Sequence, residues 1–247
     1  MPRVIENPIL NSPFEVPGRH FAFDEDGITD TVVEERRPSS YFVPIPAARK
    51  RGGQQAFETE WTKDRVEENA TINRIRAKVD AWRLGGHQHV TPTTRRLLDY
   101  WTDPARERKL FFCQVEALEI AIYLAEAAAK VGDQWIENEL RDASTRANPG
   151  LYRMAHKMAT GSGKTVVMAM IVAWQVLNKV ANPQDARFTD EFLVVTPGIT
   201  IRDRLRVLLP SDPQSYYRER DLVPPRSGRR AGPRADRHHE LPRVPTA

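Results

Sequence analysis

Residues 158–165 read Met158-Ala159-Thr160-Gly161-Ser162-Gly163-Lys164-Thr165. The two glycines of this segment allow a tight turn whose backbone N–H groups point inward and form a nest for phosphate oxygens. Lys164 can then reach the β- and γ-phosphates, and the Thr165 hydroxyl can ligate a Mg²⁺ ion that bridges them. The spacing therefore predicts a phosphate-binding loop for a nucleoside triphosphate, with these candidate residues: Thr160, Gly161, Ser162, Gly163, Lys164 and Thr165.

The segments on either side of this loop have the pattern that such a loop requires. Residues 151–158 read as a short strand, and residues 166–180 form an apolar run at helical spacing. The amino terminus of that helix would face the phosphates. Strand, loop and helix in this order predict an α/β fold with a parallel sheet, and they disfavour the alternative of a chance glycine-rich turn.

Three segments together resemble the superfamily 2 helicases and translocases, notably the motor subunits of restriction enzymes. The first is the loop itself, in which Met158 replaces the first glycine of the generic pattern. The second, Phe-Phe-Cys-Gln-Val-Glu-Ala at 111–117, resembles the Q motif, which implies that Gln114 reads the adenine edge of ATP. The third, Phe-Leu-Val-Val-Thr-Pro-Gly at 192–198, resembles motif Ia. In that motif a buried strand precedes a loop on the nucleic-acid backbone, here Thr196, Pro197 and Gly198.

Each of the last two segments also has a simpler interpretation. Gln114 alone is typical of a capping or surface glutamine, and Val194-Val195 is typical of a core strand. The order of the three motifs favours the resemblance, as do two leader segments, 7–15 and 37–46, that resemble the helicase-type subunit of type III restriction enzymes. The resemblance extends to about Pro225. It implies ATP and Mg²⁺ as cofactors, double-stranded DNA as substrate and a possible modification methyltransferase subunit as partner.

The chain divides into four predicted regions. Residues 1–53 are proline-rich and suggest an extended arm. Residues 54–110 form a helical accessory segment, 111–225 a partial RecA-like ATP-binding domain, and 226–247 a basic tail that is either disordered or translated out of frame. Helices are predicted over 60–84, from Thr91-Pro92, over 114–130 and 133–147, and around three leucines, Leu205, Leu208 and Leu209.

Composition and charge exclude several classes of protein. Of the 247 residues, 40% are hydrophobic and 28% charged, which is ordinary for a water-soluble protein. No segment approaches the roughly 20 apolar residues that cross a bilayer, so a cytoplasmic protein without membrane contact is predicted. The single cysteine, Cys113, excludes an internal disulfide. The histidines lack the cysteine spacing of a zinc site, and His87 and His89 are expected at the surface.

The net charge of +4 comes from the tail at 226–247, which holds six Arg and two acidic residues; the remainder of the chain is balanced. Basicity therefore gives no support to DNA binding by the globular part, and that prediction depends on motif Ia alone.

The sequence also predicts what this chain does not do. No acidic Walker B box follows motif Ia, and neither a second motor domain nor a nuclease motif is recognisable. We therefore assign no catalytic residues, and expect a truncated portion that binds ATP but does not hydrolyse it, translocate or cleave DNA. Two or three strands would also leave the sheet uncovered and prone to aggregation. Two alternatives are a nucleotide-kinase-like phosphotransferase and a non-catalytic fragment that binds nucleotide, or nucleic acid through its tail.

Overall fold

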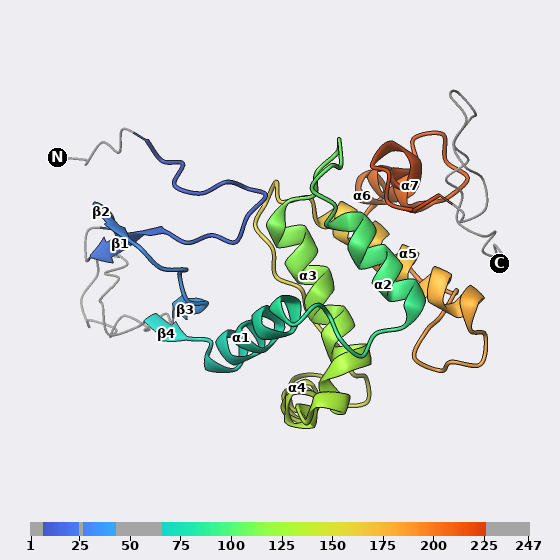
Figure 1. The fold of residues 1–247 in the computed structure, drawn as a ribbon, viewed down its shortest axis with the longest axis horizontal. Helices are drawn as coiled ribbons and strands as arrows, with labels where there is room; N and C mark the ends of the chain where they lie inside the picture. Colours follow the sequence, from blue (N-terminus) through green and yellow to red (C-terminus); the bar gives the residue numbers. More distant parts are fainter. Residues whose placement is uncertain (1–6, 25–26, 43–65, 226–247) are drawn as a thin grey trace, which may run out of the picture. The chain divides into compact units, whose positions relative to one another are not determined.

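The computed structural model describes residues 7–24, 27–42 and 66–225 (Figure 1). The chain divides into two compact units, Met1–Asp80 and Ala81–Ala247. The predicted tail, 226–247, lies outside the described residues.

The first unit contains two small antiparallel sheets. The strands β1 (His20–Asp24) and β2 (Gly27–Val33) form a hairpin, and β3 (Ser40–Phe42) pairs with β4 (Val66–Glu68). The helix α1 (Ala70–Leu84) follows β4 and continues into the second unit. The helix predicted over 60–84 thus begins ten residues later than expected. Pairing with β3 holds residues 66–68 extended. In the first turn of α1, the Asn73 side chain accepts a hydrogen bond from the Ser39 N–H (2.8 Å) and donates one to the Ser39 carbonyl (3.2 Å).

The second unit is helical in its described part. It contains α2 (Pro92–Trp101), α3 (Phe112–Ile122), α4 (Gln134–Ala147), α5 (Lys164–Ala181), α6 (Ile199–Arg204) and α7 (Tyr216–Glu219). A π-helical turn, η2 (Tyr123–Ala127), and a 3₁₀ turn, η3 (Ala128–Val131), extend α3, and η4 (Leu205–Leu208) extends α6. The helix predicted from Thr91-Pro92 is confirmed, because the Thr91 hydroxyl accepts from the Thr94 N–H at 3.0 Å.

The core of this unit forms around α5, which packs against α2, α3, α7 and η4 (Figure 1). By length and composition alone α5 could cross a membrane, since its mean hydropathy is 1.2 over 18 residues. Its apolar side chains are instead buried against the neighbouring helices, as in a core helix. The fully buried side chains of this core include Met170 and Ala173 of α5 and, on the neighbouring helices, Leu97, Leu98, Leu118 and Ile122.

The parallel sheet expected from the sequence is not seen in the described residues, whose only sheets are the two antiparallel pairs of the first unit. Residues 151–158 and 192–196 have no strand partner, and the side chains of Leu193 and Val195 are 89% and 82% exposed. A parallel strand becomes stable when neighbours on both sides satisfy its backbone and helices cover its faces. Because these two segments do not pair, the helices expected of a RecA-like domain are present without the sheet.

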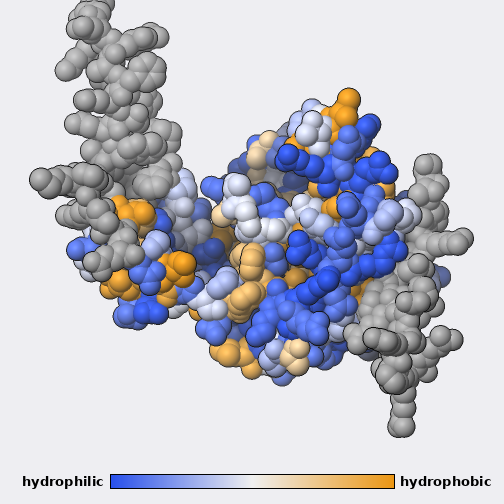
Figure 2. Space-filling model, turned by 90° about the horizontal axis from the view of Figure 1, so that it is seen from above, coloured by the Kyte–Doolittle hydropathy of each residue, from blue (hydrophilic) through white to orange (hydrophobic). Residues whose placement is uncertain are grey.

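The last described segment is anchored to α2. The indole N–H of Trp101 donates to the Leu222 carbonyl at 2.9 Å, and the buried Arg106 guanidinium donates to the carbonyls of Arg220 (2.7 Å) and Asp221. On the face seen in Figure 2, hydrophilic residues predominate and hydrophobic ones gather in small separate patches.

Candidate nucleotide-binding site

The predicted phosphate-binding loop turns directly into the amino terminus of α5. Gly161 and Gly163 both have positive φ angles, 81° and 80°, which glycine adopts without the strain that a Cβ would cause. Gly163 is the residue before the first helical position, Lys164. The first amides of a helix have no intrahelical acceptor and lie at the positive end of its dipole. The loop therefore presents the backbone that an anion nest requires.

Two side chains of the loop donate to its own carbonyl oxygens. The Lys164 ammonium contacts the carbonyls of Ala159 (3.0 Å) and Met158 (3.3 Å), and the Ser162 hydroxyl donates to the Ala159 carbonyl at 2.7 Å. Lys164 is exposed. A phosphate group would compete for these same donors, so the loop residues fit a phosphate ligand in charge and in hydrogen-bonding type.

The predicted metal ligand, Thr165, is half-buried in the first turn of α5. The described residues contain no cluster of three or more His, Cys, Asp or Glu that could hold a metal ion. A Mg²⁺ ion takes six ligands, so the Thr165 hydroxyl could supply only one of them beside phosphate oxygens and water.

Gln114 is joined to the loop. It occupies the third position of α3, where its side-chain oxygen accepts from the Phe111 N–H at 3.0 Å, and it is 5% exposed. Its side-chain N–H donates to the Ser162 carbonyl at 3.0 Å. Gln114 thus caps α3, as the simpler interpretation expected, and it also contacts the loop. An amide has two N–H donors and two acceptor lone pairs, and these two hydrogen bonds use one of each.

Gly163 is required for a second reason besides its φ angle. A Cβ at this position would lie 2.2 Å from the Gln114 side-chain nitrogen, a distance that real Cβ atoms do not show. The absence of a side chain at Gly163 therefore lets the amide of Gln114 approach the loop. Gly161, by contrast, has open space where its Cβ would be.

The residues predicted to contact nucleic acid make no hydrogen bond to the described loop residues or to Gln114. Thr196, Pro197 and Gly198 connect the unpaired segment 192–195 to α6, and the Thr196 hydroxyl donates to the Gly198 carbonyl at 3.3 Å. Within the part of the chain that the structure describes, no hydrogen bond or ion pair joins these three residues to residues 158–165.

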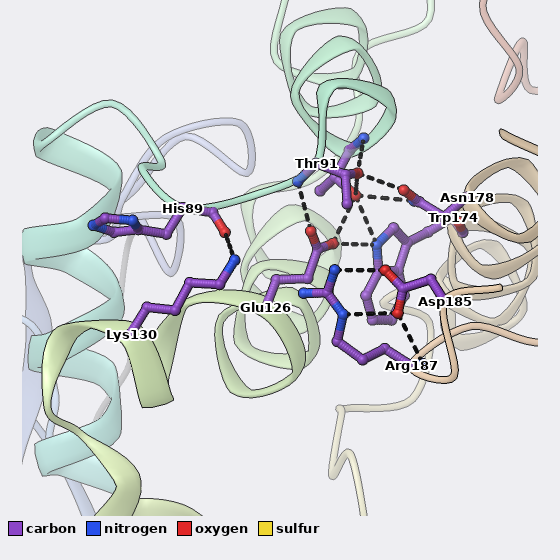
Figure 3. A network of polar contacts seen from close by, with 9 residues as sticks. His89, Thr91, Glu126, Lys130, Trp174, Asn178, Asp185 and Arg187 are labelled. Atoms are coloured by element: carbon purple, nitrogen blue, oxygen red, sulfur yellow. Dashed lines mark hydrogen bonds and ion pairs between the residues drawn. The ribbon is translucent and has the colours of Figure 1, made fainter. Parts of the chain in front are cut away.

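A buried polar network around Glu126 was not predicted from the sequence (Figure 3). The Glu126 carboxylate accepts from the Thr94 hydroxyl (2.6 Å), the Trp174 indole N–H (2.9 Å) and the Thr91 backbone N–H (2.7 Å). The Asn178 amide donates to the Thr94 hydroxyl at 2.9 Å. Two acidic residues, Glu119 and Glu126, stand inside the otherwise apolar run 117–129, and they were the signal that could have revealed it.

A second missed cluster surrounds Glu119, whose side chain is fully buried. Arg83 binds this carboxylate through its Nε at 3.0 and 2.9 Å, and His87 Nε2 lies 2.8 Å from Oε1. The prediction of a surface position was wrong for His87, whose side chain is only 12% exposed, and correct for His89. Burial raises the pKa of Glu119, but hydrogen bonds from His87 and Arg83 outweigh burial and hold this pKa below its ordinary value.

Comparison with known families gives one match that covers the loop. Residues 108–220 match the family model described as type III restriction enzyme, res subunit. Comparisons with curated proteins and with solved structures found no match.

Proposed function

Because residues 108–220 are a segment of the type III restriction enzyme res-subunit family, we propose that this chain binds ATP with Mg²⁺ as part of the motor of a helicase-like DNA translocase. One observation carries the proposal. The Gln114 side chain of α3 donates to the carbonyl of Ser162 in the loop before α5, at 3.0 Å. This contact brings the residue suited to an adenine edge next to the residues suited to phosphates.

The proposed binding mode uses both ends of the nucleotide. The phosphates lie at the amino terminus of α5, where Lys164 exchanges loop carbonyls for phosphate oxygens. Gln114 donates its second N–H to adenine N7 and accepts from the adenine N6 amino group. Guanine has a carbonyl oxygen in place of that amino group, so GTP would set acceptor against acceptor. We expect ATP to bind better than GTP by about 1 to 3 kcal/mol.

We propose that residues 1–247 bind ATP without turning it over at a useful rate. Phosphoryl transfer requires a residue that orients the attacking water and a second group that stabilises the charge of the transition state. No adjacent pair of acidic residues follows Gly198 in this sequence. Rapid ATP hydrolysis by the purified chain, lost in Lys164→Ala, would contradict this part of the proposal.

The proposal is tested by the affinity of the purified chain for ATP, measured by titration calorimetry. Lys164→Ala is expected to lower this affinity at least tenfold, since a charge-assisted hydrogen bond contributes about 1.5 to 3 kcal/mol. Lys157→Ala is the matched control, because this lysine is also exposed and precedes the loop. Equal affinities of the wild type and Lys164→Ala would overturn the proposal, as would a wild type that binds no ATP.

We also propose that DNA contacts Thr196, Pro197 and Gly198. This proposal rests on the resemblance of residues 192–198 to motif Ia. It is supported by the exposed arginines of the following helix, Arg202 and Arg204, since cationic side chains supply most of the affinity for phosphate backbones. Arg204→Ala is expected to weaken binding to a DNA duplex and to reduce the salt slope by about one. Deletion of residues 226–247 is the comparison: complete loss of DNA binding in that variant would assign the contact to the tail instead.

A further inference from the structure

We infer that Glu126 is a positioning residue, which holds the helix of Gln114 and the helix of Lys164 at a fixed spacing and so couples adenine recognition to phosphate binding. This inference rests on the proposed function, since it concerns how the two halves of one nucleotide site are kept in register.

The helix α3, with its continuation η2, contacts α5 and the loop before it at two levels. At their amino-terminal ends Gln114 contacts Ser162, just before α5, and further along Glu126 of η2 contacts Trp174 within α5. The two helices therefore run side by side in the same direction. Twelve residues separate Gln114 from Glu126, so at 1.5 Å per residue the rear contact lies roughly 18 Å behind the front one.

The rear contact is made in the core and depends on specific donors. Glu126 is 3% exposed, and its partners Thr94 and Trp174 are 0% and 3% exposed. A buried carboxylate is costly unless donors surround it, and here three donors from α2 and α5 converge on it (Figure 3). The amino terminus of α2, at Thr91, adds the positive end of a helix dipole. An apolar side chain would fill this core without demanding one spacing of the helices.

The local backbone points to the same role. Residues 123–127 form a π-helical turn within the continuation of α3. Such turns are rare, and they occur frequently at functional sites. In Figure 3 the carboxylate of Glu126 points from this turn toward Thr91 and Trp174, and so toward both neighbouring helices at once.

The coupling predicts a difference between two ligands. Tripolyphosphate requires only the loop and the start of α5, whereas ATP also requires Gln114 of α3 at the correct distance. Loosening the rear contact should therefore weaken ATP and leave tripolyphosphate unchanged. A loss of folded protein would lower the apparent affinity for both ligands by the same factor, so the ratio of the two affinities separates positioning from stability.

The test measures both affinities for Glu126→Gln in the full chain. In this variant the amide N–H₂ must face the Thr91 N–H or the Trp174 N–H, so one donor opposes another. We expect the affinity for ATP to fall about tenfold, with tripolyphosphate within twofold of the wild type. Tyr123→Phe is the matched control: it removes a buried hydrogen bond from the same π turn, to Asp133 at 2.5 Å, that does not reach α5. It should leave the ratio unchanged.

Trp174→Phe provides a second variant, because it keeps a six-membered ring in the core and removes the part of the indole whose N–H donates to Glu126 and Thr94. It should change the ratio in the same direction. An unchanged ratio in a folded Glu126→Gln, or in Trp174→Phe where Glu126→Gln does not fold, overturns the inference while leaving ATP binding by the wild type intact. A wild type that binds tripolyphosphate but not ATP overturns the inference and the proposed function together.

Discussion

At the scale of single residues, Gly163 meets two constraints that are separable by mutation. Its φ angle of 80° disfavours any L side chain, and a Cβ would lie 2.2 Å from the Gln114 amide. Gly132 has a similar φ of 85° but open space around its Cβ position. Gly132→Ala should therefore show the conformational cost alone, about 1 to 2 kcal/mol of unfolding free energy.

Gly163→Ala should lose more stability than Gly132→Ala in denaturant unfolding, and it should also lower the affinity for ATP, because Gln114 must move away from the loop. The double variant Gly163→Ala with Gln114→Ala should recover part of the lost stability. Equal losses of stability in the two glycine variants would show that Gln114 does not approach Gly163 in solution.

Glu119 gives a pH-dependent prediction. Its pKa is held below the ordinary value of 4.5, so the folded state binds this proton less tightly than the unfolded state. The resulting stability is fully present above the unfolded pKa and is lost as the pH falls through the folded pKa. At neutral pH, Glu119→Gln should lose roughly 3 kcal/mol of unfolding free energy, because Arg83 and His87 lose the buried carboxylate that they bind.

The difference in unfolding free energy between wild type and Glu119→Gln, measured in urea, should shrink as the pH is lowered below 4.5. Glu137→Gln is the comparison, since the pair of Glu137 with Arg141 is largely exposed and contributes less than about 1 kcal/mol. A difference for Glu119→Gln that stays constant with pH would mean that the carboxylate is not paired in the folded state.

At the scale of elements, the last described segment depends on α2. Trp101→Phe removes the N–H that binds the Leu222 carbonyl and should cost about 3 kcal/mol of stability. It should also speed proteolysis within residues 209–225. Trp82→Phe removes a comparable hydrogen bond, to the Gln88 carbonyl, and should leave proteolysis of that segment unchanged. Equal cleavage rates in both variants would contradict a specific anchor on α2.

Helices were predictable here to the extent that their signals are local. Thr91-Pro92 carries a capping residue and a proline, which fix a helix start independently of the rest of the chain. The turn before α5 was likewise predictable, because its positive φ angles at Gly161 and Gly163 are a local property of the backbone that favours glycine. The start of α1 was not, since pairing of β3 with β4 decides it. The Glu126 network also escaped prediction, because its members are up to 87 residues apart in the chain.

At the scale of the whole molecule, the missing sheet is the point on which sequence and structure differ most. Residues 192–196 have the composition of a core strand, yet Leu193 and Val195 are almost fully exposed. A pattern of apolar residues indicates a buried strand only when partner strands pair with it, and no described segment does so. An exposed apolar stretch with unpaired backbone groups favours association between copies of the chain.

The double variant Leu193→Lys with Val195→Lys tests this arrangement. If both side chains are exposed as the structure places them, the charges should reduce aggregation, measured by light scattering, and leave the unfolding free energy within about 0.5 kcal/mol of the wild type. Leu208→Lys is the control, because Leu208 is only 9% exposed and a buried charge there should unfold the protein. A large loss of stability in the double variant would mean that residues 192–196 are covered in solution, as in the strand of a RecA-like sheet.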